Sequence, residues 1–278
     1  MALDTYAIIT LADLKATLGI TVSTFDTQLE QAINVATDTI EQFIGHYVVQ
    51  RRVIEWTTSG GTGHVVVKHP PVGHVHYIGS GRMSAMTVDR TVATDIVNSV
   101  TLTDAKLTLT RVQADGTETV SALLFTTYKT SSALVTQINN TTGFSATLGR
   151  NCKAQYLHRF AGRDLTNASL TMTYADNGQL DTRVDNERGI IYLVASEEGG
   201  SWPYGDLSLV IDYDGGWATV PYAIEAACRS LAAGVYYSRQ RDTTLSSESL
   251  GDYSYTLQGG AASESEAMQM LAPYKRFR

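Results

Sequence analysis

The sequence predicts an α+β protein, with helices toward the two ends of the chain and strands between them. Apolar residues recur three and four positions apart in the first 50 residues and again after Pro221. Between these stretches the apolar period changes to two, and Thr and Gly become frequent, as in strands and turns. With 278 residues, 43% of them hydrophobic, the chain can bury the core of one large domain or two modest ones.

The N-terminal stretch predicts two helices. Thr10 and Asp13 resemble a capping box with Asp in place of Glu, and Gly19 follows where a short helix would end. A longer helix is predicted over roughly 26–47, because its apolar residues lie on one face. The opposite face is polar but carries little charge, so it is compatible with either water or a protein partner.

Strands are predicted from Arg51 onward. The run RRVIEW alternates, and HVVVKHPPVGHVHYI reads as two short strands that break at Pro70–Pro71, where a central strand cannot continue. These strands complete the first half of a core that we place at residues 1–78.

Residues 79–167 are expected to form an inserted β-rich domain. Its predicted order is β-β-α-β-β: a strand in SVTLTDAKLTLTRV, a strand in TETVSALLF, a short helix capped by Ser131 or Ser132, and the strands FSATL and KAQYLHRF. About 90 residues suffice for a small independent domain. We therefore expect that deleting residues 80–167 leaves a folded core.

The core resumes over residues 168–245, with three strands in LTMTYADNGQL, RGIIYLV and DLSLVIDYDGGW. A final long helix begins near Pro221, a residue favoured at the first helical position, and ends near Arg241. The residues expected to pack the core helices together are Leu29, Ile33, Ile40, Phe43, Ile224 and Leu231. Residues 246–278 are expected to be an extended C-terminal tail that does not fold alone.

Composition and charge narrow the range of functions that the chain could have. A net charge of −7 and a pI near 5.3 argue against a surface that grips nucleic acid throughout, although a local basic patch is allowed. Cys152 and Cys228 lack the spacing of a disulfide framework or a zinc module. The sequence shows neither a run of 18 apolar residues nor a signal peptide, so we expect a soluble chain that is not exported and has no membrane partner.

The side chains that could carry chemistry do not assemble into a recognisable catalytic motif. His74 and His76 would face the same side of a strand as a possible metal pair, but no nearby Asp, Glu or Cys completes the ligands, and a solvated strand edge is favoured. Asp212 and Asp214 share a strand face, where turn capping is favoured over acid catalysis. The sequence therefore predicts no catalytic residue, metal or cofactor, and a protein that is not an enzyme.

The C-terminal end combines aromatic rings with positive charge. The residues concerned are Tyr253, Tyr255, Tyr274, Lys275, Arg276, Phe277 and Arg278. Rings interleaved with cations are compatible with nucleic-acid contact, but they are also typical of protein interfaces, which we favour here.

Four motifs in order resemble the head–tail connector family of tailed phages, also called adaptor or head completion proteins. The first is ITLADLKATLGI followed by LEQAINVATDTIEQFIG, in which Leu14, Lys15, Leu18, Ile40, Glu41, Phe43 and Gly45 fill the family's positions. The second is VVVKHPPVGHVHYI, the third DYDGGWATVPYAIEAACRSL, and the fourth SSESLGDYSYTL with the terminal APYKRFR. The resemblance covers about 1–78 and 168–275, and it does not extend to the insertion.

The resemblance implies a structural virion protein with a small helical adaptor core. Such proteins form a ring of twelve copies beneath the capsid portal, extend the DNA channel, and present a surface to the next neck or tail (stopper) protein. The expected partners are the portal, neighbouring copies, that tail-side protein, and double-stranded DNA bound without sequence specificity. The expected location is the virion neck, after assembly in the host cytoplasm.

The resemblance further implies that the C-terminal residues reach the portal, so truncation after Gly260 should abolish attachment while leaving the fold intact. We expect the free chain to be monomeric or weakly associated and to form a ring only on the portal. One alternative is a receptor- or glycan-binding virion protein that uses the insertion. Others are an enzyme that uses Glu197 and Glu198 or the histidine pair, and a DNA-binding module.

Overall fold

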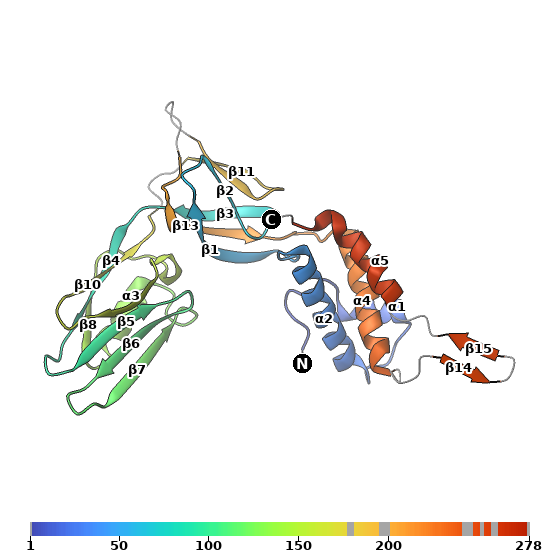
Figure 1. The fold of residues 1–278 in the computed structure, drawn as a ribbon, viewed down its shortest axis with the longest axis horizontal. Coiled ribbons are helices and arrows are strands. Elements are labelled where there is room, and N and C mark those ends of the chain that lie inside the picture. The colour runs from blue at the N-terminus through green and yellow to red at the C-terminus, as the bar shows by residue number, and fades with distance from the viewer. Residues whose placement is uncertain are drawn as a thin grey trace.

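The structure is a computed structural model that describes residues 2–176, 181–194, 201–240, 247–250, 253–256 and 261–276. The molecule is elongated: helices gather at one end, the inserted domain lies at the other, and small antiparallel sheets join them (Figure 1). The predicted α+β class is confirmed.

The N-terminal helices begin and end where the sequence predicts their signals. α1 (Leu11–Leu18) has the full capping box, in which the Thr10 hydroxyl accepts from the Asp13 backbone and the Asp13 carboxylate accepts from the Thr10 backbone. α2 (Asp26–Ile44) ends earlier than the predicted Tyr47. Gly45 adopts φ +86°, a left-handed conformation that stops the helix and suits a residue without a Cβ.

The helical end is held by one apolar cluster that joins α1 and α2 to α4 (Tyr222–Gln240) and α5 (Ala261–Leu271). Four of the predicted packing residues are fully buried in it: Leu29, Ile33, Ile40 and Ile224. Phe43 and Leu231 are only partly buried, and their neighbours on the two helices, Ile44 and Cys228, take the fully buried positions.

Two three-stranded sheets form the middle of the molecule. The first has the order β1 (Arg51–Ser59), β13 (Gly205–Gly215), β3 (Val72–Gly79), and all its pairings are antiparallel. The second has the order β11 (Thr182–Asp185), β12 (Ile190–Leu193), β2 (His64–Val66). The predicted break between β2 and β3 is present at Pro70–Pro71, whose peptide bond is cis.

The part of the chain predicted to be an inserted domain folds into two sheets and one helix. β7 (Glu118–Leu124), β6 (Lys106–Val112), β5 (Val97–Leu102) and β9 (Phe160–Asp164) form one sheet in that order. β10 (Leu170–Tyr174), β4 (Met83–Arg90) and β8 (Phe144–Leu148) form the other. α3 (Ser131–Asn139) and the 3₁₀ turn η1 (Ala154–Tyr156) complete the domain.

Several predicted elements of this domain need correction. SVTLTDAKLTLTRV is a hairpin rather than one strand, because the polar residues after Leu102 turn the chain so that Leu102 pairs with Leu107. KAQYLHRF begins with η1 and reaches a strand only at Phe160. The helix is capped by Thr130, whose hydroxyl accepts from the Ala133 backbone, and not by Ser131 or Ser132. β10 pairs with β4, so the domain's sheet extends past residue 167.

The inserted domain and the central sheet share their apolar packing. Trp56 of β1 and Val210 of β13 are buried in the same cluster as Val100 and Leu134 of the insertion. The Trp56 indole donates to the backbone carbonyl of Gln155 at 3.1 Å. The insertion is therefore joined to the core by a continuous interior, and not only by its two connecting strands.

A buried carboxylate completes this seam. We expected Asp212 to cap a turn, but it lies within β13 and is fully buried. It accepts a forked pair of bonds from Arg52 at 2.7 and 2.9 Å, one from Lys153 at 2.8 Å and one from the Tyr156 hydroxyl at 2.7 Å. Since Arg52 belongs to β1 and the other two donors belong to the insertion, Asp212 ties the two parts together.

Candidate partner interface

The C-terminal segment folds back onto the helical end of the molecule. α5 lies against α4 (Figure 1), and its Ala267 and Leu271 side chains are buried in the helical cluster. These two residues are four apart and so lie on one face of the helix. The segment therefore differs from the extended tail that we expected over residues 246–278.

The residues after α5 are engaged by the rest of the chain. η2 (Ala272–Tyr274) brings the Tyr274 ring edge-on to Trp217, with 5.8 Å between centroids. The Lys275 ammonium lies 4.9 Å from the centroid of the Phe43 ring. Arg276 donates from its backbone to the Ile44 carbonyl at 3.0 Å and from its guanidinium to the Lys68 carbonyl at 2.6 Å.

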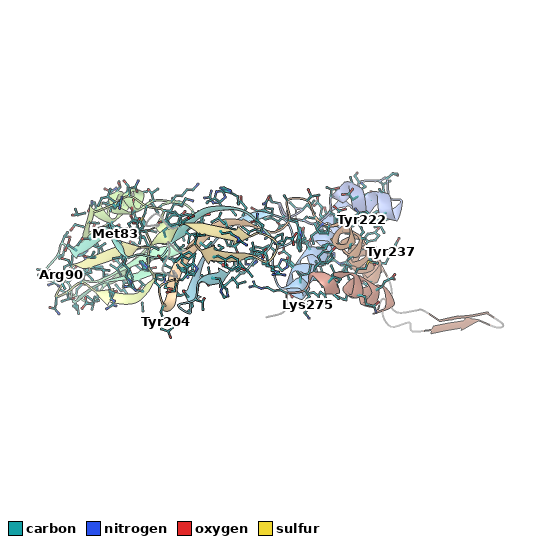
Figure 2. All side chains as sticks on the ribbon, turned by 90° about the horizontal axis from the view of Figure 1, so that it is seen from above. Met83, Arg90, Tyr204, Tyr222, Tyr237 and Lys275 are labelled. Carbon is teal, nitrogen blue, oxygen red and sulfur yellow. The ribbon has the colours of Figure 1, made fainter. Side chains whose placement is uncertain are left out.

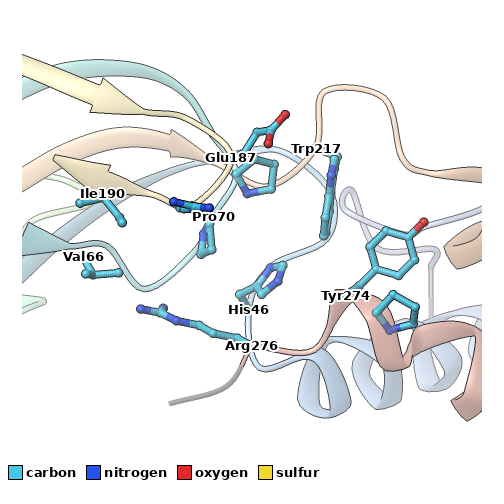
Figure 3. Close-up of a pocket in the computed structure, with 11 residues that line it drawn as sticks. His46, Val66, Pro70, Glu187, Ile190, Trp217, Tyr274 and Arg276 are labelled. Atoms are coloured by element: carbon cyan, nitrogen blue, oxygen red, sulfur yellow. The ribbon is translucent and has the colours of Figure 1, made fainter.

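This segment forms one wall of a groove between the helices and the central sheets (Figure 3). The groove encloses about 570 Å³. Aromatic, proline and aliphatic side chains line most of it, and charged residues stand among them. The full lining is His46, Val66, Pro70, Pro71, Glu187, Arg188, Ile190, Trp217, Pro273, Tyr274 and Arg276. Aromatic and arginine side chains around an apolar floor are typical of protein-binding surfaces.

His46 is a neutral part of this wall at pH 7. Burial lowers the pKa of its imidazole, hydrogen bonds to the backbone of Tyr47 and Tyr274 oppose that shift, and the charge of Arg276 adds to it. Its ring packs against Trp217 with 5.2 Å between centroids. The groove can therefore present apolar surface and the fixed charges of its other residues to a partner. The His46 imidazole adds no positive charge to the groove at neutral pH.

The remaining predicted interface residues lie apart from the groove or outside the description. The backbones of Tyr253 and Tyr255 belong to β15 (Tyr253–Thr256), which pairs with β14 (Ser247–Leu250) as a hairpin. Both views show this hairpin away from the body of the molecule (Figures 1 and 2). Phe277 and Arg278 lie outside the described residues.

A projecting hairpin of two strands contributes little to the stability of the fold, but it is well placed to contact another chain. An isolated two-stranded sheet is marginal in water, and its outer edges offer unpaired backbone groups to another chain. Its position beyond the helices extends the reach of the C-terminal segment at that end of the molecule.

The histidine pair has a carboxylate partner, and the two cysteines are buried or half-buried. His76 lies 3.0 Å from the Asp214 carboxylate, and its ring packs edge-on to His74. Across the described ranges, no group of three or more His, Cys, Asp or Glu side chains is placed to hold a metal. Burial raises the pKa of Cys152 to about 11 and that of Cys228 to about 12, so neither thiol is an activated nucleophile at pH 7.

Trp217 and His46 are interface candidates that the sequence reasoning did not single out. Trp217 stands in the DYDGGW run that carried the family resemblance, and His46 follows the glycine that ends α2. Each residue lies just beyond the end of a helix or strand, where a side chain can face a neighbouring segment.

Among the described helices, none is both long and apolar enough to span a membrane.

The comparisons with known proteins support the class inferred from the sequence. Residues 8–67 match the family described as phage gp6-like head-tail connector proteins. These residues contain α1, α2, β1 and β2. The predicted resemblance to head–tail connectors is therefore confirmed in this part of the chain. No curated protein matches the sequence at a significant level.

Three solved structures are similar to this chain over its full length, at low identity. One is described as the neck of a native GTA particle computed with C12 symmetry, at 15% identity and a TM-score of 0.43, covering 100% of this chain and 93% of that chain. The second is the neck of an empty GTA particle computed with C6 symmetry, at 13% identity and a TM-score of 0.38, covering 100% and 94%. The third is the virion of a native gene transfer agent particle, at 14% and 0.43, covering 100% and 94%.

Proposed function

We propose that this chain is a structural adaptor in the neck of a tailed-phage-like particle, where it joins the capsid portal to the next neck or tail protein. The observation that carries the proposal is the family match over residues 8–67, which includes α1 and α2 of the helical end. On this proposal the protein is not an enzyme, and it reaches the virion neck after assembly in the host cytoplasm.

The copies form a ring of twelve, the number that the family resemblance implies. The helical end offers surface for such contacts, since Tyr222 is 76% exposed and Tyr237 is 43% exposed on the same helix (Figure 2). Exposed tyrosines supply large contact area at low entropic cost. The face of α2 away from the core carries polar residues that include the acids Glu30 and Asp38, so a neighbouring copy that packs there must supply partners for these carboxylates.

The ring surrounds the DNA channel without holding the DNA by sequence. The chain's net charge of −7 supports this arrangement, because a surface of the same sign as DNA lets the duplex slide without adhering. The end of the ring away from the portal meets the tail-side neck protein.

The helical end, with the C-terminal segment, binds the portal. Its proposed contact residues remain Tyr253, Tyr255, Tyr274, Lys275, Arg276, Phe277 and Arg278. Since Tyr274 and Arg276 already contact Trp217 and Lys68, they present the groove as a preformed surface. A preformed surface loses less conformational entropy on binding than a free tail would.

A pull-down on the purified portal of the same particle tests the proposal. The full chain is compared with Tyr274→Ala, and Tyr204→Ala serves as a matched control because Tyr204 is 87% exposed in the middle of the molecule (Figure 2). Loss of a partly buried tyrosine anchor should weaken attachment by about 1–3 kcal/mol, whereas the control should bind like the wild type.

Circular dichroism of each variant separates lost binding from lost fold. Full retention of Tyr274→Ala on the portal would remove the C-terminal segment from the interface. Failure of the wild-type chain to bind the portal at all would contradict the adaptor role itself.

A further inference from the structure

A small pocket lies at the seam between the central sheet and the inserted domain. Trp56 of β1 and Leu207 of β13 form its core side, and Arg82, His158 and Arg159 form its insertion side. It encloses about 130 Å³. That is roughly the volume of four water molecules, which suits a compact ion better than a drug-sized ligand.

Two arginines bring positive charge to this pocket. Arg82 is exposed at its rim, and the guanidinium of Arg159 lies 5.7 Å from the centroid of the Trp56 ring. Burial lowers the pKa of Arg159, which means that its charge is poorly solvated, although Asp104 opposes that shift. A poorly solvated cation is stabilised by a counter-charge that enters the pocket.

Asp104, the acidic residue that already contacts Arg159, neutralises only part of the positive charge at the pocket. Asp104 contacts the Nε atom of Arg159 at 2.5 Å, but its side chain is 72% exposed, so it lies toward the solvent side. Residues 79–167 hold nine lysines and arginines against six acidic residues, in a chain whose net charge is −7. The insertion is thus the basic part of an acidic protein.

His158 adds a neutral donor. Burial lowers the pKa of its imidazole, a backbone hydrogen bond to Thr173 opposes the shift, and the charge of Arg82 adds to it. Its Nδ1 lies 3.2 Å from the Thr173 hydroxyl, which fixes the ring orientation. In the tautomer in which Nδ1 accepts from the Thr173 hydroxyl, the single N–H of the neutral ring is on Nε2 and can donate to an oxygen-rich anion.

The core wall of the pocket is held in an uncommon backbone geometry. Leu207 adopts φ +46°, a left-handed conformation that costs a non-glycine residue energy, and its N–H donates to the Thr58 hydroxyl at 3.2 Å. On the same side of the pocket, the Trp56 indole N–H already donates to the Gln155 carbonyl, so Trp56 provides a packed surface and not a donor. The polar groups that face a ligand therefore come from the insertion.

We propose that this seam pocket binds a tetrahedral oxyanion of the phosphate type, held by Arg82 and Arg159 with His158 as a neutral donor. Arginine recognises such anions through paired N–H bonds, and a partly desolvated site strengthens them. The anion is either a free phosphate or the phosphodiester group of DNA. The proposal does not rest on the adaptor role, because it concerns the isolated chain.

Calorimetric titration of the full chain with inorganic phosphate, at ionic strength balanced with chloride, tests the proposal. We expect one saturable site in the wild type and in Arg163→Gln, which removes an exposed arginine of β9 that does not line the pocket. Arg82→Gln should weaken binding about tenfold or more, the scale of one charge-assisted hydrogen bond. Arg159→Lys, checked by thermal unfolding, should weaken it as well because a lysine ammonium lacks the planar fork that presents two parallel N–H donors to one anion.

Competition with a short labelled DNA duplex distinguishes the two sources of the anion. Duplex binding that depends on Arg82 and is displaced by phosphate assigns the pocket to DNA, whereas phosphate binding that the duplex does not disturb assigns it to the free ion. The proposal is overturned if the wild type shows no saturable phosphate binding. It is also overturned if Arg82→Gln and Arg163→Gln bind phosphate equally well.

Discussion

At the scale of single residues, Asp212 shows how a buried charge can join two parts of a chain. Its carboxylate accepts four hydrogen bonds from three side chains in two different parts of the molecule. Burial alone would raise the pKa of Asp212, but the bonds from Arg52, Lys153 and Tyr156 outweigh burial and lower it to about 2. The ionised form is thus the one that the fold stabilises.

This shift predicts a defined pH dependence of stability. Because the folded pKa lies below the usual value of 3.8, the contribution of Asp212 is complete above about pH 4 and is lost as the pH falls toward 2. Its size at neutral pH is about 2 kcal/mol, from the free energy that corresponds to one pKa unit. Urea unfolding of the wild type and Asp212→Asn from pH 2 to pH 6 measures this contribution.

The two curves should differ most at pH 5–6 and converge near pH 2. Asp181→Asn is the control, since Asp181 is exposed and should leave the curve nearly unchanged. A gap between wild type and Asp212→Asn that stays constant down to pH 2 would show that the asparagine acts through packing and not through lost charge.

At the scale of elements, α5 decides whether the C-terminal segment is part of the fold. Leu271 is fully buried in the helical cluster, whereas its neighbour Met270 is 42% exposed on the same helix. Leu271→Ala should lower the free energy of unfolding by about 2–5 kcal/mol through lost packing and the cavity that remains. Met270→Ala should change it by less than about 0.5 kcal/mol.

Urea unfolding followed by circular dichroism compares the two variants. If Leu271→Ala is no more destabilised than Met270→Ala, α5 is not docked in the free protein, and it is then available to reach a partner. The same burial revises our expectation for truncation after Gly260: removing α5 would expose the apolar faces that Leu271 covers, so point variants are the better probes of attachment.

The elements that the sequence predicts well are those with local signals. Thr10, Asp13 and Gly19 mark both ends of α1, and Pro221 marks the start of α4, since caps act within a few residues of each other. Strand existence was also predictable from alternation. The pairing of the strands could not be predicted from alternation. β1 pairs with β13 across more than half of the chain, and no local pattern encodes such a pairing.

At the scale of the whole molecule, the insertion is a built-in part of the interior and not an appendage. The predicted start of the insertion after residue 78, where the family motifs stop, and its predicted end at residue 167 stay predictions, and nothing in the sequence indicated the seam. β10 returns to pair with β4, and Trp56 and Val210 are buried against the insertion from the core side. These contacts join residues far apart in the sequence, so neither the composition nor the hydrophobic periodicity of the sequence predicts them.

The groove and the seam pocket were likewise beyond prediction. Tyr274 and Arg276 were identified from their residue types, which are typical of interfaces. Their partners Trp217, Ile44 and Lys68 come from three separate segments, and only the folded chain brings them together. Residue chemistry thus indicated what the interface contains, whereas its shape depends on tertiary packing.

Deletion of the insertion tests this account of the whole molecule. Replacing residues 80–167 by a short Gly/Ser turn would leave β10 without β4 and Asp212 without Lys153 and Tyr156. It would also expose Trp56 and Val210, each now buried, and a buried apolar side chain contributes about 1.5–3 kcal/mol. We therefore expect the deletion protein to aggregate or to unfold at much lower urea than the full chain, contrary to the expectation from sequence. Deleting residues 80–176 together with Trp56→Gln, Val210→Thr and Asp212→Asn removes these liabilities and should recover soluble protein with the circular dichroism of the helical end. A simple deletion as stable as the full chain would show that the shared interior contributes little and that the insertion folds independently.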